Sequence, residues 1–273
     1  MIQGNKILAS LKETFASIRN HKALFLLLIL VQAVFVVLLS VLLISYSTEI
    51  MKNAQEIVSY SEHLNLDENM IGADMKSQAE ILGKDPLLMY QKFKKIINSI
   101  IILAAGSALL ILFFNTANWG IAELFFRKPN LKEFLQHVLK LFFVNIVYLS
   151  ILGALAFAVF QNFYLEMIIT NGAFIFLAAA LIAIILYFML VSMSLSSEKL
   201  FDIFKKTISV GIRKFHFAFF GYAVILILLS LFFLLFFISQ EKAFLLLMAA
   251  GFLFFLSFVF CRIFFIRLVR NIA

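Results

Sequence analysis

The chain has 273 residues, of which 64% are hydrophobic and only 14% are charged, and its 23 Lys and Arg residues outnumber its 15 Asp and Glu residues. An average soluble domain is about half apolar and about a quarter charged, so this composition excludes a soluble globular protein. The apolar residues gather into unbroken stretches of roughly 20, the helix length that crosses about 30 Å of hydrocarbon. Because β-barrel strands would alternate polar and apolar residues, the sequence predicts an all-α polytopic membrane protein.

Residues 1–22 precede the first apolar stretch and form a basic amphipathic segment. Ile7, Leu11 and Phe15 recur with helical spacing, whereas Lys6 and Lys12 lie outside that stripe. We expect a helix in the plane of the lipid headgroups. A shorter segment of the same kind lies at 131–138 and a longer one at 196–216. The chain would then consist of three diverged repeats, each an amphipathic segment followed by two crossings. The alternative explanation is that membrane insertion alone imposes this pattern without any repeat.

Six stretches of the remaining chain, 23–273, have the length and composition of membrane crossings. The first is too long for the core of a signal peptide and is followed by no cleavage pattern, so we expect it to be retained. The single cysteine, Cys261, allows no intramolecular disulfide, so helix packing must supply the stability. The expected spans are residues 23–45, 96–118, 138–160, 173–195, 217–239 and 243–260.

Residues 46–95 form the one sizeable connection, between the first and second expected spans. Apolar residues recur near helical spacing at its start, Gly83 is placed to end a helix, and Asp85 with Pro86 is a suitable cap and first turn for the next helix. We expect a small helical insertion outside the cytoplasm. Its acidic residues match neither a calcium loop nor a zinc pattern, so no metal site is predicted.

Polar residues within the expected spans are few, and most lie toward one end. Asn115, Thr116 and Glu123 share one face of the second expected helix, Asn145 lies in the third, and Arg262 lies near the end of the sixth. Together they would line a vestibule open to the cytoplasm. In the alternative interpretation the asparagines hydrogen-bond neighbouring helices and the arginine extends its charge toward the headgroups.

The most informative stretch is 196–216. On a helix, one face would carry apolar side chains and the rest would carry five basic residues, so we expect it to lie in the headgroup plane and to contact anionic lipid. In the alternative interpretation, the basic residues only reflect the positive charge that cytoplasmic connections usually carry, and the helix has no lipid-binding function. The apolar residues are Leu200, Phe201, Phe204, Ile208, Ile212 and Phe215, and the candidate headgroup contacts are Lys199, Lys205, Lys206, Arg213 and Lys214.

The distribution of Lys and Arg indicates the orientation. The N-terminal segment, the connections at 119–137 and 196–216 and the C-terminal tail carry most of the 23 basic residues, whereas the short connections on the other side have only Lys242. Short loops rich in Lys and Arg stay in the cytoplasm. The sequence predicts a multi-pass protein of the cell membrane with both termini in the cytoplasm.

The layout of the whole chain resembles that of a known group of membrane proteins. The basic amphipathic run into the fifth span (FDIFKKTISVGIRKFHFAFFGYAVILILL), the large outer segment after the first span and the basic aromatic end (CRIFFIRLVRN) are similar to the layout of YciC-like six-helix membrane proteins. They also resemble the related membrane domain of some glycerophosphodiester phosphodiesterases. The resemblance covers the whole chain in layout and implies an envelope protein linked to lipids, with no catalytic residues to carry over.

The sequence contains no metalloprotease, nucleophile-elbow, phosphate-loop or dinucleotide motif. We therefore expect no enzyme activity, no cofactor and no nucleic acid partner. The expected function is that of a scaffold, assembly factor or lipid-associated accessory protein, whose partners are anionic lipid headgroups and a second membrane protein. The alternative is a transporter or channel that uses the polar vestibule.

Overall fold

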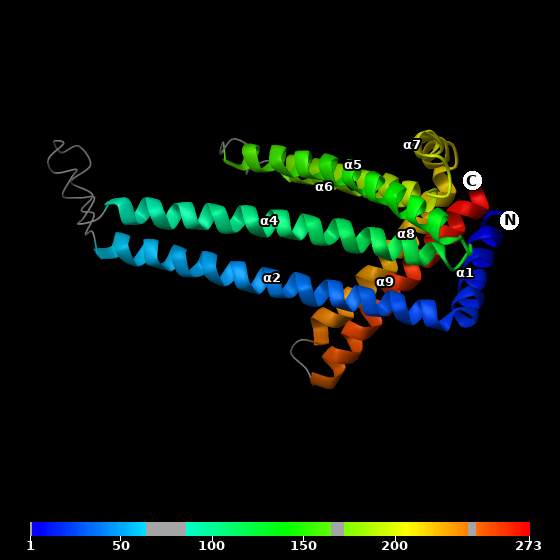
Figure 1. Ribbon diagram of the computed structural model, residues 1–273, viewed down its shortest axis with the longest axis horizontal. Coiled ribbons are helices and arrows are strands. Elements are labelled where there is room, and N and C mark those ends of the chain that lie inside the picture. The colour runs from blue at the N-terminus through cyan, green and yellow to red at the C-terminus, as the bar shows by residue number, and fades with distance from the viewer. Residues whose placement is uncertain (1, 64–85, 165–171, 240–243) are drawn as a thin grey trace. The chain divides into compact units, whose positions relative to one another are not determined.

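The computed structural model describes residues 2–63, 86–164, 172–239 and 244–273. All regular secondary structure in these residues is helical (Figure 1). The elements are α1 (Ile2–Asn20), α2 (Lys22–His63), α4 (Pro86–Glu123), α5 (Leu131–Tyr164), α6 (Gly172–Ser194), α7 (Leu200–Ile208), the π-helical turn η2 (Ser209–Arg213), α8 (Phe215–Ser239) and α9 (Phe244–Ile272).

Six of the described helices are long and apolar enough to cross a membrane. Large apolar side chains such as Val37, Phe113 and Phe233 remain exposed along them, which is the arrangement expected when hydrocarbon is the solvent. The prediction of an all-α polytopic membrane protein with six crossings is confirmed. The helical segments that contain these apolar stretches are Lys22–Tyr60, Leu87–Glu123, Leu131–Val159, Phe176–Ser194, Phe215–Ile238 and Met248–Ile272.

The chain divides into two compact units, and the smaller one is Phe35–Ile111. It contains most of α2 and the first part of α4, packed antiparallel: Lys92 forms an ion pair with Glu56, and a Cβ atom on Gly106 would lie 3.1 Å from the Leu42 side chain. Residues 46–63 and 86–95 of the expected outer insertion are thus helical, as direct continuations of α2 and α4. Pro86 is the first residue of α4, as predicted, whereas Gly83 lies outside the described residues.

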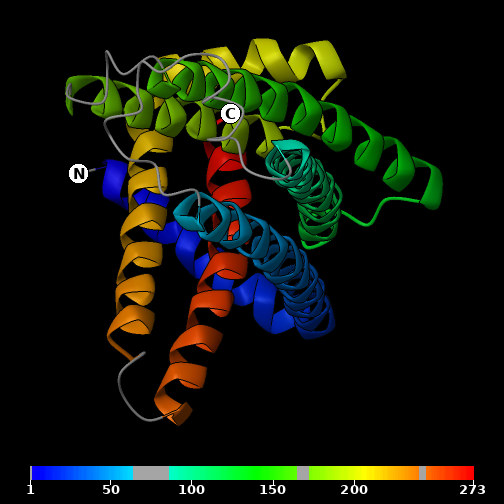
Figure 2. The ribbon, with the colours of Figure 1, turned by 90° about the vertical axis from the view of Figure 1, so that its left-hand side faces the viewer.

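The larger unit, Met1–Val34 with Leu112–Ala273, is built around α9. This helix packs against α8, α1 and α6, and residues 261–266 within it are all buried. Figure 2 shows α8 and α9 running side by side, and in Figure 1 α1 lies beside the C-terminal end of the chain. The centre of this unit is therefore the last helix of the sequence.

The position of the C-terminal segment corrects the sequence prediction. We expected the last span to end at residue 260 and a basic tail to follow, but α9 continues without a break to Ile272. The reason is that the arginines at 262, 267 and 270 are separated by apolar residues that pack inward. In addition, acidic side chains on α1 and α4 form ion pairs with Arg267 and Arg270.

The short amphipathic segment expected at 131–138 is not a separate element. It is the first part of α5, whose start is capped by Asn130: the Asn130 Oδ1 atom accepts a hydrogen bond from the backbone N–H of Glu133 at 2.9 Å. This is the side-chain cap that a helix start requires, because its first N–H groups have no partner within the helix. In contrast, the segments at the N-terminus and at 200–213 do form the separate helices α1 and α7.

Candidate functional site

Three of the five predicted polar residues come together in one buried network between α4 and α5. The Asn115 Nδ2 atom donates to Asn145 Oδ1 at 2.8 Å, and Asn145 Nδ2 donates to Thr116 Oγ1 at 2.8 Å. Asn145 and Thr116 are buried, and Asn115 is half-buried. Because lipid offers no competing hydrogen bonds, side-chain amides of this kind join neighbouring membrane helices.

A second buried pair of amide side chains joins α2 to α4. Asn118 Nδ2 donates to Gln32 Oε1 at 2.9 Å. The Asn118 Oδ1 atom is buried and has no partner among the described residues. Gln32 thus contacts an asparagine that is absent from the predicted cluster.

Glu123 and Arg262, the two charged members of the predicted cluster, have different surroundings. Glu123 is buried and forms an ion pair with Arg270 of α9. Arg262 is only 8% exposed, and its guanidinium lies 5.8 Å from the ring centre of Trp119 and 6.0 Å from that of Phe258. Arg262 has no ion pair in the described part of the chain, and its Nη1 atom has no hydrogen-bond partner there. Aromatic faces stabilise this cation in place of an acid.

The N-terminal helix is attached to α9 by a further charged contact. Arg267 Nε donates to Glu13 Oε2 at 2.5 Å, and Asn271 Nδ2 donates to the Ser10 hydroxyl at 3.1 Å. The hydrogen bond from Arg267 lowers the pKa of Glu13 below its ordinary value, and the Asn271 amide acts in the same direction. Glu13 and Glu123 belong to segments that the charge distribution places on the same side of the membrane as the arginines at the end of the sequence, and this was the signal that could have predicted both pairs.

The five predicted headgroup contacts are found on and next to α7 and η2. Lys199, Lys205 and Arg213 have exposed side chains. Lys206 is also exposed but forms an ion pair with Glu198 at 2.6 Å. Lys214 is half-buried, and its Nζ atom donates to the backbone carbonyls of Ile272 and Ala273. Three of the five basic side chains are therefore available to a ligand without breaking an ion pair found in the described residues.

The face by which α7 attaches to the larger unit lies outside the apolar stripe that we expect to enter the acyl boundary. Ile203 and Thr207 are 0% and 1% exposed, whereas Phe201, a member of the stripe expected to face lipid, is 87% exposed. The hydroxyl groups of Tyr148 and Ser192 lie 2.7 Å apart, and those of Ser192 and Thr207 lie 3.0 Å apart. This chain of hydroxyls joins α5, α6 and α7. Sequence reasoning missed Ser192 and Thr207, although three alternate serines at 192, 194 and 196 are unusual in an apolar stretch.

Polar contacts also fix the connection that leads into α7. The Ser196 hydroxyl lies 3.3 Å from His137 Nε2, and Lys140 Nζ donates to the backbone carbonyl of Glu198 at 2.9 Å. Residues 191–196 are all buried. As a result α7 is anchored at its start and along one side, while Phe201, Asp202 and Lys205 remain exposed.

Among the described residues, no group of three or more His, Cys, Asp or Glu side chains could hold a metal ion. The helices and their buried amide and arginine contacts define an integral membrane protein of the multi-pass α-helical class. No protein-family model, curated protein or solved structure matches the chain.

Proposed function

We propose that this integral membrane protein is a non-enzymatic, lipid-associated scaffold or accessory protein that binds anionic headgroups through α7 and η2. One observation carries the proposal. On a helix anchored by Ile203 and Thr207, the exposed side presents the apolar residues Phe201 and Ile212 next to basic residues. An exposed phenylalanine is unfavourable in water but favourable at the boundary between headgroups and acyl chains.

The charges on this surface suit an anionic membrane leaflet. Lys199, Lys205 and Arg213 are exposed, and Asp202 is the one acidic residue within α7. Each basic residue near such a leaflet contributes on the order of 1 kcal/mol, and the attraction falls off within a Debye length. The leaflet concerned is the cytoplasmic one, because loops rich in Lys and Arg remain on that side.

The buried polar groups support a structural role over a catalytic or transport role. Asn115, Thr116 and Asn145 use their hydrogen-bonding groups on one another, and Glu123 is held by Arg270. Catalysis or transport within the membrane requires polar groups that reach a substrate. Here the same groups join helices.

The test uses the full-length protein reconstituted in vesicles that contain a minor fraction of anionic phospholipid. After mild detergent extraction, the anionic share of the co-purifying lipid is measured at low and high salt. Replacing Lys199, Lys205 and Arg213 together by Gln should lower the enrichment at low salt by at least about fivefold, the equivalent of one lost charge contact. High salt should lower the wild-type enrichment in the same direction.

The matched control removes three exposed positive charges from the smaller unit, by Lys52→Gln, Lys94→Gln and Lys95→Gln. These substitutions change the net charge equally but leave α7 and η2 intact. An equal fall in both triple variants, or unchanged enrichment in the α7 variant, would show that this surface does not select anionic lipid.

A further inference from the structure

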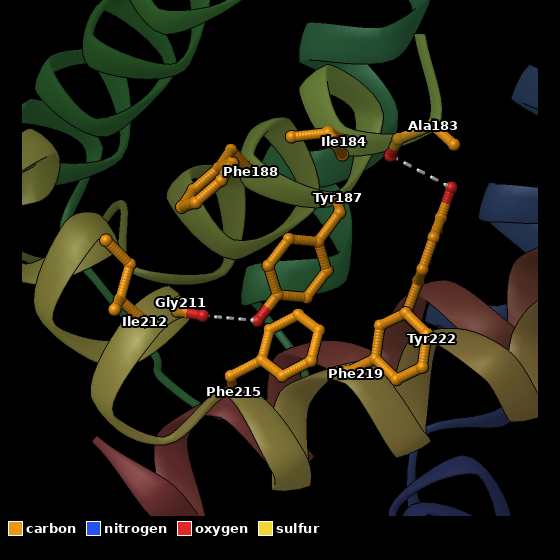
Figure 3. Close-up of a pocket in the computed structure, with 9 residues that line it drawn as sticks. All are labelled: Ala183, Ile184, Tyr187, Phe188, Gly211, Ile212, Phe215, Phe219 and Tyr222. Carbon is orange, nitrogen blue, oxygen red and sulfur yellow. Dashed lines mark hydrogen bonds between the residues drawn. The ribbon is translucent and has the colours of Figure 1, made fainter. Parts of the chain in front are cut away.

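A pocket of about 480 Å³ lies where α6, η2 and α8 meet, beside the surface assigned to headgroups (Figure 3). Ligand sites in proteins typically have volumes of about 300–1,000 Å³, so the pocket is large enough for part of an organic molecule. Tyr187 of α6 and Phe215 and Tyr222 of α8 form its aromatic walls, with ring centres 5.8–5.9 Å from Tyr187. The pocket therefore has a defined shape.

The π-helical turn helps to build this pocket. The Tyr187 hydroxyl donates to the backbone carbonyl of Gly211 at 3.1 Å, which satisfies a carbonyl near the break between η2 and α8. A Cβ atom on Gly211 would lie 2.7 Å from the Phe188 ring, so only glycine permits this close approach. π-Helical turns occur frequently at functional sites. Here the turn places Ile212 at the pocket and the exposed Arg213 directly after it.

The lining indicates the chemistry of the occupant. None of the nine residues drawn in Figure 3 is charged, and the hydroxyls of Tyr187 and Tyr222 already donate to backbone carbonyls. A polar headgroup would gain little inside such a pocket. An apolar chain is the suitable occupant.

The mouth of the pocket determines where that chain comes from. Ile184 and Ile212 line the pocket and are 52% and 62% exposed, and α6 and α8 are membrane-crossing helices. The pocket is thus open to hydrocarbon along one side, and its η2 end lies next to Arg213. Lys214 is not available there because it binds the carbonyls of Ile272 and Ala273.

We infer that this pocket holds one acyl chain of an anionic phospholipid whose phosphate is bound by Arg213. The inference rests on the proposed function, since it assumes that anionic headgroups gather on α7 and η2. Because the bilayer is itself apolar, the selectivity comes from close packing against the aromatic walls and from the positive charge of Arg213, which follows Ile212 of the lining.

The experiment counts phospholipids retained by the full-length protein in mild detergent, using native mass spectrometry after incubation with an anionic or a zwitterionic phospholipid of equal chain length. The wild-type protein should retain one anionic phospholipid in preference to the zwitterionic one. Ala183→Phe fills the pocket from α6 and should abolish this adduct. Ala179→Phe adds the same bulk one turn away, at an exposed position that does not line the pocket, and should retain it.

A second pair of variants keeps the test valid if Ala183→Phe fails to fold. Ile184→Trp adds bulk at the already exposed mouth and should also remove the adduct, whereas Ile182→Trp, exposed on the same helix but not in the lining, should not. Arg213→Gln should lower the ratio of anionic to zwitterionic adducts about fivefold.

The outcomes separate this inference from the proposed function. If Ile184→Trp and Ala183→Phe retain the adduct, the pocket does not hold the chain, even where the Lys199, Lys205 and Arg213 variant has lost its lipid enrichment. If the adduct depends on the pocket but anionic and zwitterionic lipids bind equally, the assignment of Arg213 is wrong.

Discussion

Individual polar side chains in this protein act mainly by joining helices. Asn145 is the clearest case, because its amide both accepts a hydrogen bond from Asn115 and donates one to Thr116. A buried polar group that loses its partner costs more than the hydrogen bond was worth, whereas removing both partners is nearly neutral. In membrane proteins such bonds contribute about 0.6 kcal/mol on average and up to about 1.7 kcal/mol.

A pair of substitutions tests this asymmetry. Asn145→Leu should lower the free energy of unfolding in mixed micelles by about 1 kcal/mol, because Asn115 is left without its partner. The double variant Asn115→Leu/Asn145→Leu should be at least as stable as Asn145→Leu, since Thr116 can donate to a carbonyl of its own helix. A double variant that is markedly less stable than the single one would show that packing, not hydrogen bonding, dominates at this position.

At the level of helices, the contact between α8 and α9 determines the packing of the larger unit. A Cβ atom on Gly221 of α8 would overlap the Leu268 side chain of α9. Leu268 is fully buried and has little room to move. Small residues at helix contacts let membrane helices approach closely, and the favourable term is packing rather than the hydrophobic effect.

Adding one methyl group at this contact should therefore be costly. Gly221→Ala should lower the free energy of unfolding by about 1–3 kcal/mol, the usual cost of overpacking a core. Gly153→Ala in α5 is the matched control, because a Cβ atom there meets nothing within 4 Å. The control should be neutral or more stable by up to about 1 kcal/mol, since alanine favours a helix. The measurement is thermal unfolding of both variants in the same detergent. Equal changes in stability for Gly221→Ala and Gly153→Ala would show that the contact between Gly221 and Leu268 is unimportant.

For the molecule as a whole, the notable feature is the unequal burial of its spans. More than half of the residues in the apolar window of Met248–Ile272 are buried, whereas at most a third are buried in the corresponding window of every other described span. The helix α1 packs on the last turns of α9 through the Glu13–Arg267 and Ser10–Asn271 contacts. The two ends of the chain thus lie next to each other within the larger unit.

The side on which they lie is a prediction of the charge distribution. A reporter that fluoresces only when it folds in the cytoplasm, fused after Ala273, should be active, because the arginine-rich end of α9 remains inside. A reporter active only outside the cytoplasm should be silent at the same position. The opposite pair of results would reverse the orientation and move the headgroup surface of α7 to the outer leaflet.

The sequence by itself determined the solvent of this protein and therefore its class. Unbroken apolar stretches permit only helices in hydrocarbon, so the number of crossings followed from composition and length. Helix starts were also predictable where a local signal exists, as at Pro86, because proline at the first helical position needs no contact with the rest of the chain. These are properties of a segment and its solvent alone.

The tertiary structure decided which residues meet. Asn115, Thr116 and Asn145 were predicted as a group and are joined, but Arg262 lies on Trp119 and Glu123 pairs with Arg270. The period of α7 indicated an apolar stripe that includes the exposed Phe201, but it did not indicate that Ile203 and Thr207 hold the helix against the larger unit. Helical spacing gives relative angles around an axis, whereas the rotation of a helix against its neighbours depends on side chains far away in the sequence.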